Sequence, residues 1–364
     1  MGVTRRRRWT GALVAGLLLT AVAACEVPDP QPGETLPTSY ALPPCGQPVQ
    51  PPCLPAATRL NHSYDGGGVP ARTYDLYLPT DGSAGPHPLI IYVHGGGWVF
   101  GDKSEVRCSP SLAPAGRVCV PASELERGYA VAAINYRLHD LTTGANRFLD
   151  LLADVRLAVA HLKQDAASLG LDPARFVLVG ASAGGQLASI AALTADGDPA
   201  TSVAGFVNLV GPGEMAAHVE WLDRHDEPVA PTQQQMADIF RSYVGCAPGA
   251  DPRDDPACNL LMIQASPLLH ALQATPSDPP GYFVCGTVDQ YMPCTADDVP
   301  AGEAPYRGLA ATYDALLAAR GGQGDDAFLD RHSSPNVPAN PHNPTFDLNL
   351  AGLRLFLDAV APVG

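Results

Sequence analysis

Apolar runs and helical stretches alternate along the first half of the chain. Residues 89–93 and 129–136 are mostly apolar, as strands buried on both faces of a parallel sheet are. Residues 73–78 alternate polar and apolar positions, which is typical of an early strand with one exposed face. Residues 147–169 have the period of an amphipathic helix. The alternation predicts an α/β protein with a mostly parallel central sheet and helices on both faces.

The second half of the chain continues the pattern, with one interruption. The expected elements are strands at residues 176–179, 203–210 and 282–285, and helices at 183–195 and 350–360. Residues 212–264 mix polar and helical segments instead, and we expect them to form a cap-like insertion. A smaller insertion is expected at residues 105–126. We predict a single catalytic domain over residues 58–364.

The N-terminus is typical of an export signal. Four arginines, Arg5 to Arg8, precede an apolar run at residues 11–24 that is too short for an ordinary membrane span. The run ends in Val-Ala-Ala-Cys25, which resembles a bacterial lipobox, in which the cysteine is lipidated. We expect a signal peptide at residues 1–24 and an extracytoplasmic lipoprotein anchored at the cell surface through Cys25. Full secretion after cleavage nearby is the alternative.

Composition and charge narrow the range of functions. Hydrophobic residues make up 46% and charged residues 16% of the chain, the balance of a globular enzyme. The net charge is −15, and it becomes about −19 without the four N-terminal arginines. Such a surface argues against nucleic acid partners. We expect contact with a membrane only through the lipid anchor. The sequence contains no signal of the oligomeric state.

The cysteines fit an oxidising compartment. Nine is an odd number for an exported chain, and lipidation of Cys25 leaves eight. These fall into couples about ten residues apart: Cys45 and Cys53, Cys108 and Cys119, Cys246 and Cys258, Cys285 and Cys294. Local disulfides are the economical expectation, the first of them within a proline-rich tether at residues 25–57. No couple has the C-x₂-C spacing of a zinc site, so we expect no metal.

A G-x-S-x-G pattern lies at residues 180–184, centred on Ser182. It follows an expected strand and precedes an expected helix of small residues. A sharp turn between the two would hold the serine hydroxyl clear of the sheet. Ser182 is therefore the candidate nucleophile.

A second glycine-rich segment, His-Gly-Gly-Gly-Trp at residues 94–98, follows the expected strand 89–93. The backbone N–H groups of Gly95, Gly96 and Gly97, with that of Ala183, are candidates for an oxyanion hole. A phosphate-binding loop would require a Lys-Ser/Thr ending, which is missing. We expect His94 to brace this loop rather than act as an acid or base.

The segments HGGGWVFGDK (residues 94–103) and GASAGGQLA (residues 180–188) resemble those of α/β-hydrolase carboxylesterases. The hormone-sensitive-lipase-like and feruloyl- or acetyl-esterase-like branches are the most similar. The resemblance extends to YDLYLP at residues 74–79 and to Ser-Pro-Leu at residues 266–268, and it spans about residue 57 to the C-terminus. It implies an α/β-hydrolase fold and a serine esterase that needs no cofactor.

The resemblance also implies a catalytic acid, in the family pattern G-x-x-D-x-x-[VI]-P. Residues 286–293 fit this pattern, with Asp289 as the acid and Met292 in place of the aliphatic residue. The chain order serine, acid, histidine is then kept. Asp297 and Asp298 are the fallback acids, and a Cys285–Cys294 bridge would enclose Asp289.

The base is less clearly marked, because the His-Gly-aromatic motif of the family is missing. Residues 327–331 are typical of a strand, which puts His332 at its end and leaves residues 333–341 as a loop before His342. A base must reach back over the sheet edge to Ser182, which favours His342. His332 is the alternative.

Several other residues have simpler interpretations. His218 and His225 lack the spacing of a zinc protease, so we do not expect them to bind metal. For Trp98, Trp221 and Tyr291, a packing role is favoured over a place in the substrate pocket.

The favoured function is hydrolysis of small-molecule or polymer-borne carboxylic esters through an acyl-enzyme on Ser182. The same triad acting on an amide or peptide bond is the second hypothesis. A catalytically silent surface lipoprotein is the third. The sequence does not identify the acyl group or the alcohol group of the substrate.

The lipobox pattern generates a first prediction. Cys25→Ser removes the only expected lipidation site, so the protein should pass from the membrane fraction into the medium. Fractionation followed by immunoblotting measures this. An unchanged membrane fraction would contradict the anchor.

Overall fold

The structure is a computed structural model. It describes residues 57–79, 81–107, 124–224, 232–247, 249–286, 309–320, 329–332, 336–337, 340–344 and 350–363. Cys25, Cys45, Cys53, Cys108, Cys119 and Cys294 lie outside these residues, as do Asp289, Asp297, Asp298, Tyr291 and His225. The expectations that rest on them stay predictions. Among the described helices, none combines the length and apolar composition that a membrane crossing requires.

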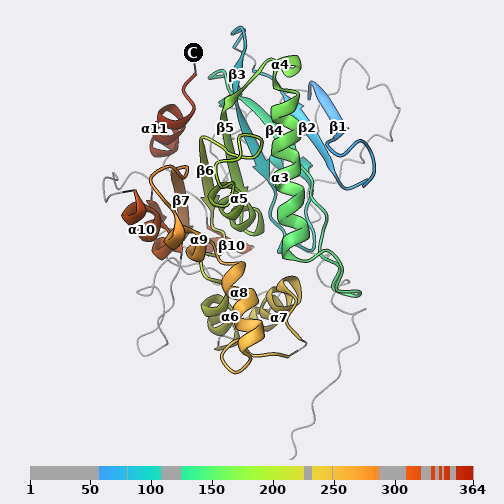
Figure 1. Cartoon of the computed structure of the whole chain (residues 1–364), viewed down its shortest axis with the longest axis vertical. Helices are drawn as coiled ribbons and strands as arrows, with labels where there is room; N and C mark the ends of the chain where they lie inside the picture. Colours follow the sequence, from blue (N-terminus) through green and yellow to red (C-terminus); the bar gives the residue numbers. More distant parts are fainter. Residues whose placement is uncertain are drawn as a thin grey trace, which may run out of the picture.

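The described strands form one central sheet of eight and a separate short pair (Figure 1). In the central sheet the spatial order is β1-β2-β4-β3-β5-β6-β7-β8. Only the pairings of β1 with β2 and of β2 with β4 are antiparallel. The strands are β1 (Arg59–Ser63), β2 (Thr73–Tyr77), β3 (His87–Val93), β4 (Ala130–Ile134), β5 (Leu171–Ala181), β6 (Gly205–Leu209), β7 (Gly281–Gly286) and β8 (Leu329–His332). The predicted mostly parallel sheet is confirmed.

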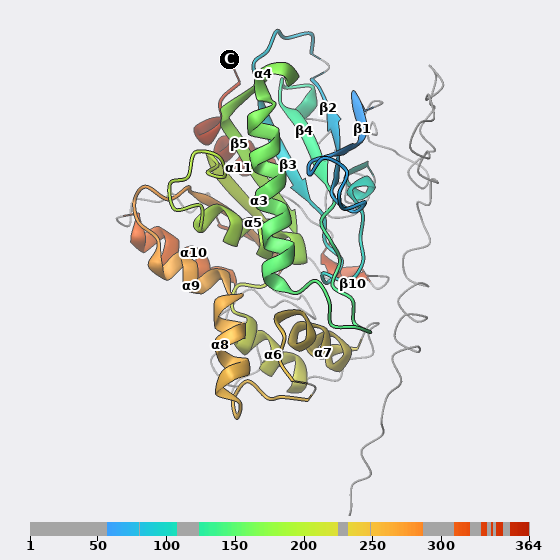
Figure 2. The same ribbon diagram turned by 45° about the vertical axis from the view of Figure 1, so that its right-hand side comes forward.

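Each face of the sheet has its own hydrophobic core, because successive side chains of a strand point to opposite faces. Leu89, Ile91 and Val93 of β3 belong to the core beneath helices α3 (Phe148–Gln164) and α5 (Ala183–Leu193). Ile90 and Tyr92 belong to the opposite core, which α11 (Leu350–Val360) covers. Figure 2 shows α3 and α11 on the two sides of the sheet.

The long helix predicted at residues 147–169 is divided in two. Helix α3 ends at Gln164, and the short α4 (Ala166–Leu169) follows Asp165. Gly170 then ends α4 in the left-handed conformation (φ 70°), which glycine adopts without a steric penalty. The period of the apolar positions runs through the break, so the sequence alone did not reveal it.

The expected cap-like segment forms the helices α6 (Met215–Arg224), α7 (Gln233–Val244) and α8 (Pro256–Gln264), which we call the helical insertion. It lies beyond the carboxyl ends of the parallel strands (Figures 1 and 2). Helix α9 (Pro267–Gln273) then returns the chain to the sheet, beside α10 (Leu309–Ala319).

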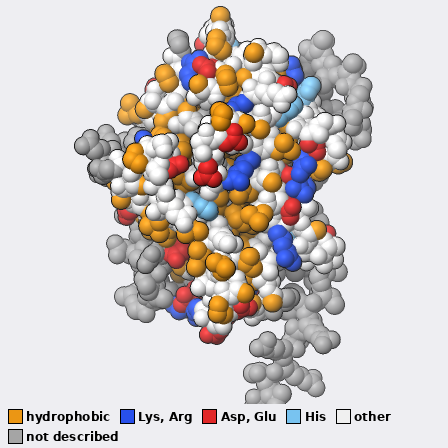
Figure 3. Space-filling view, in the orientation of Figure 1, with side chains coloured by type: hydrophobic (Ala, Val, Ile, Leu, Met, Phe, Trp, Pro, Cys, Tyr) orange, Lys and Arg blue, Asp and Glu red, His pale blue; other side chains and the backbone are white. Residues whose placement is uncertain are grey.

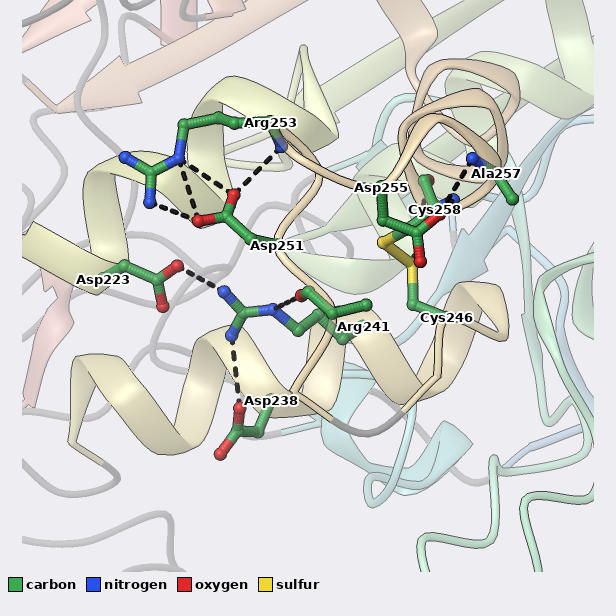
Figure 4. Close-up of a disulfide and its surroundings, with 10 residues drawn as sticks. Asp223, Asp238, Arg241, Cys246, Asp251, Arg253, Asp255, Ala257 and Cys258 are labelled. Atoms are coloured by element: carbon green, nitrogen blue, oxygen red, sulfur yellow. Dashed lines mark hydrogen bonds and ion pairs between the residues drawn. A yellow bond between two sulfur atoms is a disulfide. The ribbon is translucent and has the colours of Figure 1, made fainter. Parts of the chain in front are cut away.

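The helical insertion is held together by its own contacts (Figure 4). A disulfide joins Cys246, just after α7, to Cys258 in α8, which confirms the expected local pairing for this couple. Arg241 forms ion pairs with Asp223 of α6 and Asp238 of α7. Cys285 at the end of β7 is also disulfide-bonded, but the pairing with Cys294 lies outside the described residues.

The two ends of the helical insertion meet at Ser266. Its hydroxyl donates to the carbonyl oxygen of Met262 (2.8 Å) and accepts the N–H of Met215 (2.9 Å). Next to it, the N–H of Leu268 donates to the carbonyl oxygen of Gly213 (3.0 Å). The Ser-Pro-Leu segment therefore closes the base of the insertion.

The expectation of a continuous loop at residues 333–341 is wrong. Strand β9 (Asn336–Val337) pairs with β10 (Asn340–Pro344), so His342 lies in a short strand. Asn340 is paired with Val337, and Pro344 with Asn336. The prolines around this strand pair are typical of loops, and they conceal the strands in the sequence pattern.

Hydrophobic side chains gather over the lower half of the face shown in Figure 3, where α8 and α9 lie. Leu260 and Ile263 of α8 and Leu272 of α9 are among the exposed large hydrophobic residues. Acidic and basic side chains are interspersed over the upper half of the same face.

Candidate active site

Ser182 lies in a sharp turn between β5 and α5. Its backbone has φ 51° and ψ −119°, a region that residues with a side chain rarely adopt. Its N–H donates to the carbonyl oxygen of Leu209 in the neighbouring strand (2.7 Å), and its own carbonyl accepts the N–H of Gly185 (2.9 Å). Ser182 is partly exposed, whereas Ala181 and Ala183 on either side are buried. The structure therefore has the strand–turn–helix geometry that the G-x-S-x-G pattern predicts.

The glycines of this pattern are required by close backbone contacts. A Cβ on Gly180 would lie 2.1 Å from the carbonyl oxygen of Gly184, and a Cβ on Gly184 would lie 2.1 Å from that of Val93. Both neighbouring atoms belong to the backbone, so they have little freedom to move away. A larger residue at Gly184 would force the turn apart from β3, and one at Gly180 would force β5 apart from the start of α5.

The segment after β3, residues 94–101, lies beside Ser182, and we call it the glycine loop. A Cβ on Gly95 would lie 3.4 Å from the Cβ of Ser182. Gly96 and Gly97 have φ values of 101° and 57°, and both are partly exposed. The structure thus brings together the two glycine-rich segments that the sequence singled out.

His94 braces the glycine loop from within, in agreement with expectation. Its ring is fully buried and stacks on Tyr136 with centroids 4.3 Å apart. Its Nδ1 is 2.8 Å from the carbonyl oxygen of Gly95, so Nδ1 carries the proton and donates. Burial lowers the pKa of His94 to about 4, which keeps the imidazole neutral.

A buried ion pair supports the far end of the loop. Lys103 Nζ lies 3.4 Å from Asp75 Oδ1, and both side chains are almost completely buried. Asn135 Nδ2 donates to Asp102 (2.6 Å), and Asn135 Oδ1 accepts the N–H of Lys103 (2.5 Å). Beside them, burial raises the pKa of Glu105 to about 7. Removing one partner of a buried pair leaves an uncompensated charge, so loss of Lys103 or Asp75 alone should be strongly destabilising.

A third segment approaches the turn from β6 and was not identified from the sequence. Val210 has φ 50°, an outlier for a β-branched residue, and its N–H donates to the carbonyl oxygen of Val284 (2.8 Å). A Cβ on Gly211 would lie 2.7 Å from the carbonyl oxygen of Ser182. Asn208 accepts the N–H of Gly211 (2.7 Å). The sequence feature that could have identified this segment is Asn208, a polar residue inside an otherwise apolar strand.

The described backbone bears on the candidate acid and base only through strand pairing. Strand β8 is parallel to β7 and pairs His332 with Gly286, so His332 ends at the same sheet edge as the segment leading to Asp289. His342 lies in β10. The side chains of the two histidines are not among those described, and the choice between them stays a prediction.

Trp98, His218 and Trp221 pack in or beside the helical insertion. Trp98 stacks on Tyr243 with centroids 4.2 Å apart, and His218 stacks on Phe240 at 5.0 Å. Trp221 is buried in the same core. In the part of the chain that the structure describes, no three His, Cys, Asp or Glu residues are grouped to hold a metal.

Residues 74–296, more than half of the chain, match the BD-FAE family. The chain belongs to the BD-FAE family. The matched region includes the glycine loop, the Ser182 turn, the helical insertion and Asp289.

Several known proteins similar to this BD-FAE chain are esterases. Carboxylesterase NlhH of Mycobacterium tuberculosis is 27% identical over 290 residues, which cover 70% of this chain and 81% of that protein. A probable isoprenylcysteine alpha-carbonyl methylesterase of Oryza sativa subsp. japonica is 36% identical over 123 residues. That match covers 34% of this chain and spans only 25% of the methylesterase. The relatives identify this BD-FAE protein as a carboxylic ester hydrolase.

Solved structures share the fold. A truncated carbohydrate esterase from gut microbiota matches with a TM-score of 0.59 and 17% identity, covering 86% of this chain and all of that one. Esterase Est2 of Thermogutta terrifontis matches with a TM-score of 0.54 and 20% identity, covering 86% and 96%. The predicted α/β-hydrolase fold is confirmed.

The close backbone contacts generate a second prediction. Gly184→Ala places a Cβ 2.1 Å from one backbone oxygen and 2.4 Å from another, so it should lower esterase activity at least about 100-fold, since misplacement of about 1 Å costs that much. Steady-state kinetics on a p-nitrophenyl ester measures it. Gly68→Ala is the matched control, because its Cβ meets only Asp65 Oδ2 at 3.6 Å. Full activity of Gly184→Ala would contradict the tight turn.

Proposed function

We propose that this BD-FAE hydrolase cleaves carboxylic esters through an acyl-enzyme on Ser182. The observation that carries the proposal is the strained, positive-φ backbone of Ser182, a residue that is partly exposed beside Gly95 of the glycine loop. Strain of this kind persists only where the surroundings impose it, and it is common at catalytic groups. A serine in a relaxed helix or strand would not need glycine at both Gly180 and Gly184.

In the proposed reaction a histidine takes the proton from Ser182 Oγ, and the oxygen attacks the ester carbonyl carbon. The protonated histidine then gives this proton to the leaving alcohol. A water molecule, activated by the same histidine, attacks the acyl-enzyme and releases the acid. We assign the histidine to His342, with His332 as the alternative. Asp289 is the residue proposed to orient it.

The negative charge on the carbonyl oxygen is proposed to be stabilised by backbone N–H groups. Gly95, Gly96 and Gly97 supply the donors on one side, and Ala183, the first residue of α5, supplies one on the other. The N-terminus of a helix carries a partial positive charge, which adds to the effect. Two observations support this assignment: the loop lies beside Ser182, and His94 fixes it from within.

We propose that the substrates are small-molecule or polymer-borne esters outside the cytoplasm. The export signal and the lipobox pattern support this location. One structure with a similar fold is a carbohydrate esterase. Its name describes that protein's substrate, and it is consistent with a polymer-borne ester as the substrate of this chain. Hydrolysis of an aryl amide faster than of the matching p-nitrophenyl ester would favour the amidase alternative.

A fluorophosphonate probe tests the nucleophile. It should label the wild-type protein on Ser182, as mapped by peptide mass spectrometry, and Ser182→Ala should abolish both labelling and ester hydrolysis. Ser168→Ala is the control, because this exposed serine only donates to the carbonyl oxygen of Asp165. Label on another residue, or none, would refute the acyl-enzyme.

The base is tested by two single variants. His342→Ala should lower kcat about 10⁴-fold or more with little change in KM, because proton transfer is lost while binding survives. His332→Ala should have a mild effect, or act through stability, because His332 ends β8. The opposite result would identify His332 as the base. If both variants stay active, the triad is misassigned.

A further inference from the structure

The glycine loop is connected to the helical insertion through Trp98. This residue has φ 64° although it carries a large side chain, and its ring is buried. The ring stacks on Tyr243 of α7, with the planes 10° apart, and meets the edge of Phe240 at a centroid distance of 4.8 Å. The conformation at Trp98 follows two left-handed glycines, Gly96 and Gly97. The path of the whole loop therefore depends on what holds this ring.

Gln186 joins the three segments that meet at Trp98. It lies on α5, one turn after Ser182, and is fully buried. Its Oε1 accepts the indole N–H of Trp98 (3.1 Å) and the hydroxyl of Tyr243 (3.2 Å). Its Nε2 donates to the carbonyl oxygen of Ala265 at the end of α8 (2.8 Å).

The orientation of the Gln186 amide is fixed by its partners. An indole N–H only donates, so it must face the amide oxygen, and a carbonyl oxygen only accepts, so it must face the amide nitrogen. A flipped amide would oppose both contacts. Gln186 thus holds Trp98 of the glycine loop, Tyr243 of α7 and the end of α8 in one arrangement relative to Ser182.

Helix α7 also contacts the loop directly. The space in front of Gly97 is bounded by Met236, whose sulfur would lie 3.9 Å from a Cβ built on that glycine. Packed interiors transmit small displacements instead of absorbing them. A shift of α7 therefore reaches the glycine loop through both Met236 and Trp98.

We propose that Gln186 is a positioning residue, which sets the N–H groups of the glycine loop against Ser182 through the Trp98 side chain. The helical insertion thereby influences the geometry of the site through Tyr243, which contacts both Trp98 and Gln186. This inference rests on the proposed function of the loop as an oxyanion hole. Gln186 does not touch the reacting atoms; it acts through Trp98.

The first test is Gln186→Met, which keeps length and volume but removes both the acceptor and the donor. It should lower kcat about 10- to 100-fold with a change in KM below about 3-fold, because misplaced oxyanion donors weaken transition-state binding selectively. Gln273→Met is the matched control. It makes the same substitution at an exposed position of α9, away from Trp98 and α7, and kcat should stay within about 2-fold.

The second test is Gln186→Glu, which restores the contacts only in its protonated form. A protonated carboxyl accepts from Trp98 with one oxygen and donates to Ala265 with the other. Burial favours this neutral form and raises the pKa of the introduced carboxyl. The kcat relative to wild type should therefore be near normal at low pH and fall as the pH rises. A ratio as low as that of Gln186→Met at every pH would contradict the hydrogen-bond role.

The third test is a double-mutant cycle with Trp98→Phe, which keeps an aromatic ring but loses the N–H. If Gln186 acts through Trp98, Gln186→Met should lower kcat by less than about 3-fold in this background. Equal losses in both backgrounds would overturn the proposal. If Gln186→Met does not fold, as judged by circular dichroism, Trp98→Phe alone decides, with a loss of about 10-fold in kcat expected and an unchanged kcat refuting the link.

Labelling of the wild-type protein distinguishes a failure of the proposed acyl-enzyme function from a failure of the proposed role of Gln186. If the fluorophosphonate does not react with wild-type Ser182, the proposed function fails and the role of Gln186 fails with it. If Ser182 is labelled but Gln186→Met keeps kcat within about 2-fold, or changes only KM, the proposed function stands and only this inference is overturned.

Discussion

The close backbone approach around Ser182 is the constraint on which the rest of the structure depends. At Gly180 and Gly184 the neighbouring carbonyl oxygens leave no room for a Cβ. Because Gly184 has no Cβ, the first turn of α5 packs directly on the end of β3. The glycine loop, which continues β3, therefore lies beside Ser182. The hydrophobic cores on the two faces fix the strands that carry these segments. A larger residue at Gly184 would separate the Ser182 turn from the end of β3, and one at Gly180 would disrupt the turn itself.

Parallel strands explain why strained residues from distant parts of the sequence gather at one place. Strands β3, β5 and β6 are neighbours and end at the same edge of the sheet, where ligand sites of such folds form. Trp98, Ser182 and Val210 follow these ends, and each has a positive φ. Each is also held by a contact from another segment: Trp98 by Gln186, Ser182 by Leu209 and Val210 by Val284. The backbone strain is thus shared by three residues along this edge of the sheet, and a contact from another segment holds each of them in its conformation.

The sequence allowed the architecture and the two glycine-rich segments to be predicted, because both depend on local signals. Buried parallel strands are continuous apolar runs, and a turn without space for a Cβ requires glycine. The role of Gln186 could not be predicted in this way, since its three partners come from segments that lie far apart in the chain. The division of the helix at Asp165 and the β9–β10 pair were missed for a related reason. In both cases the local pattern, a continuous period or a run of prolines, favours a different structure.

The catalytic histidine and acid could not be assigned from local sequence patterns alone. Asp289 was identified through a family pattern, and the pairing of Gly286 with His332 places that histidine at the same edge. His342 was favoured because it was expected deep in a loop, yet it lies in β10. A choice between two histidines that depends on reach over a sheet edge requires tertiary structure, which residue types and spacing do not contain.

The closure at Ser266 has a consequence for how this fold can change during evolution. The segments entering and leaving the helical insertion are joined by hydrogen bonds to a single side chain and its neighbours. The entropic cost of lengthening a closed segment grows only slowly with its length. The disulfide of the insertion also lies wholly inside it. The helices between residues 215 and 264 therefore form a module that can be exchanged or resized while the sheet is preserved, provided that an aromatic ring and a hydroxyl are still presented to Trp98 and Gln186.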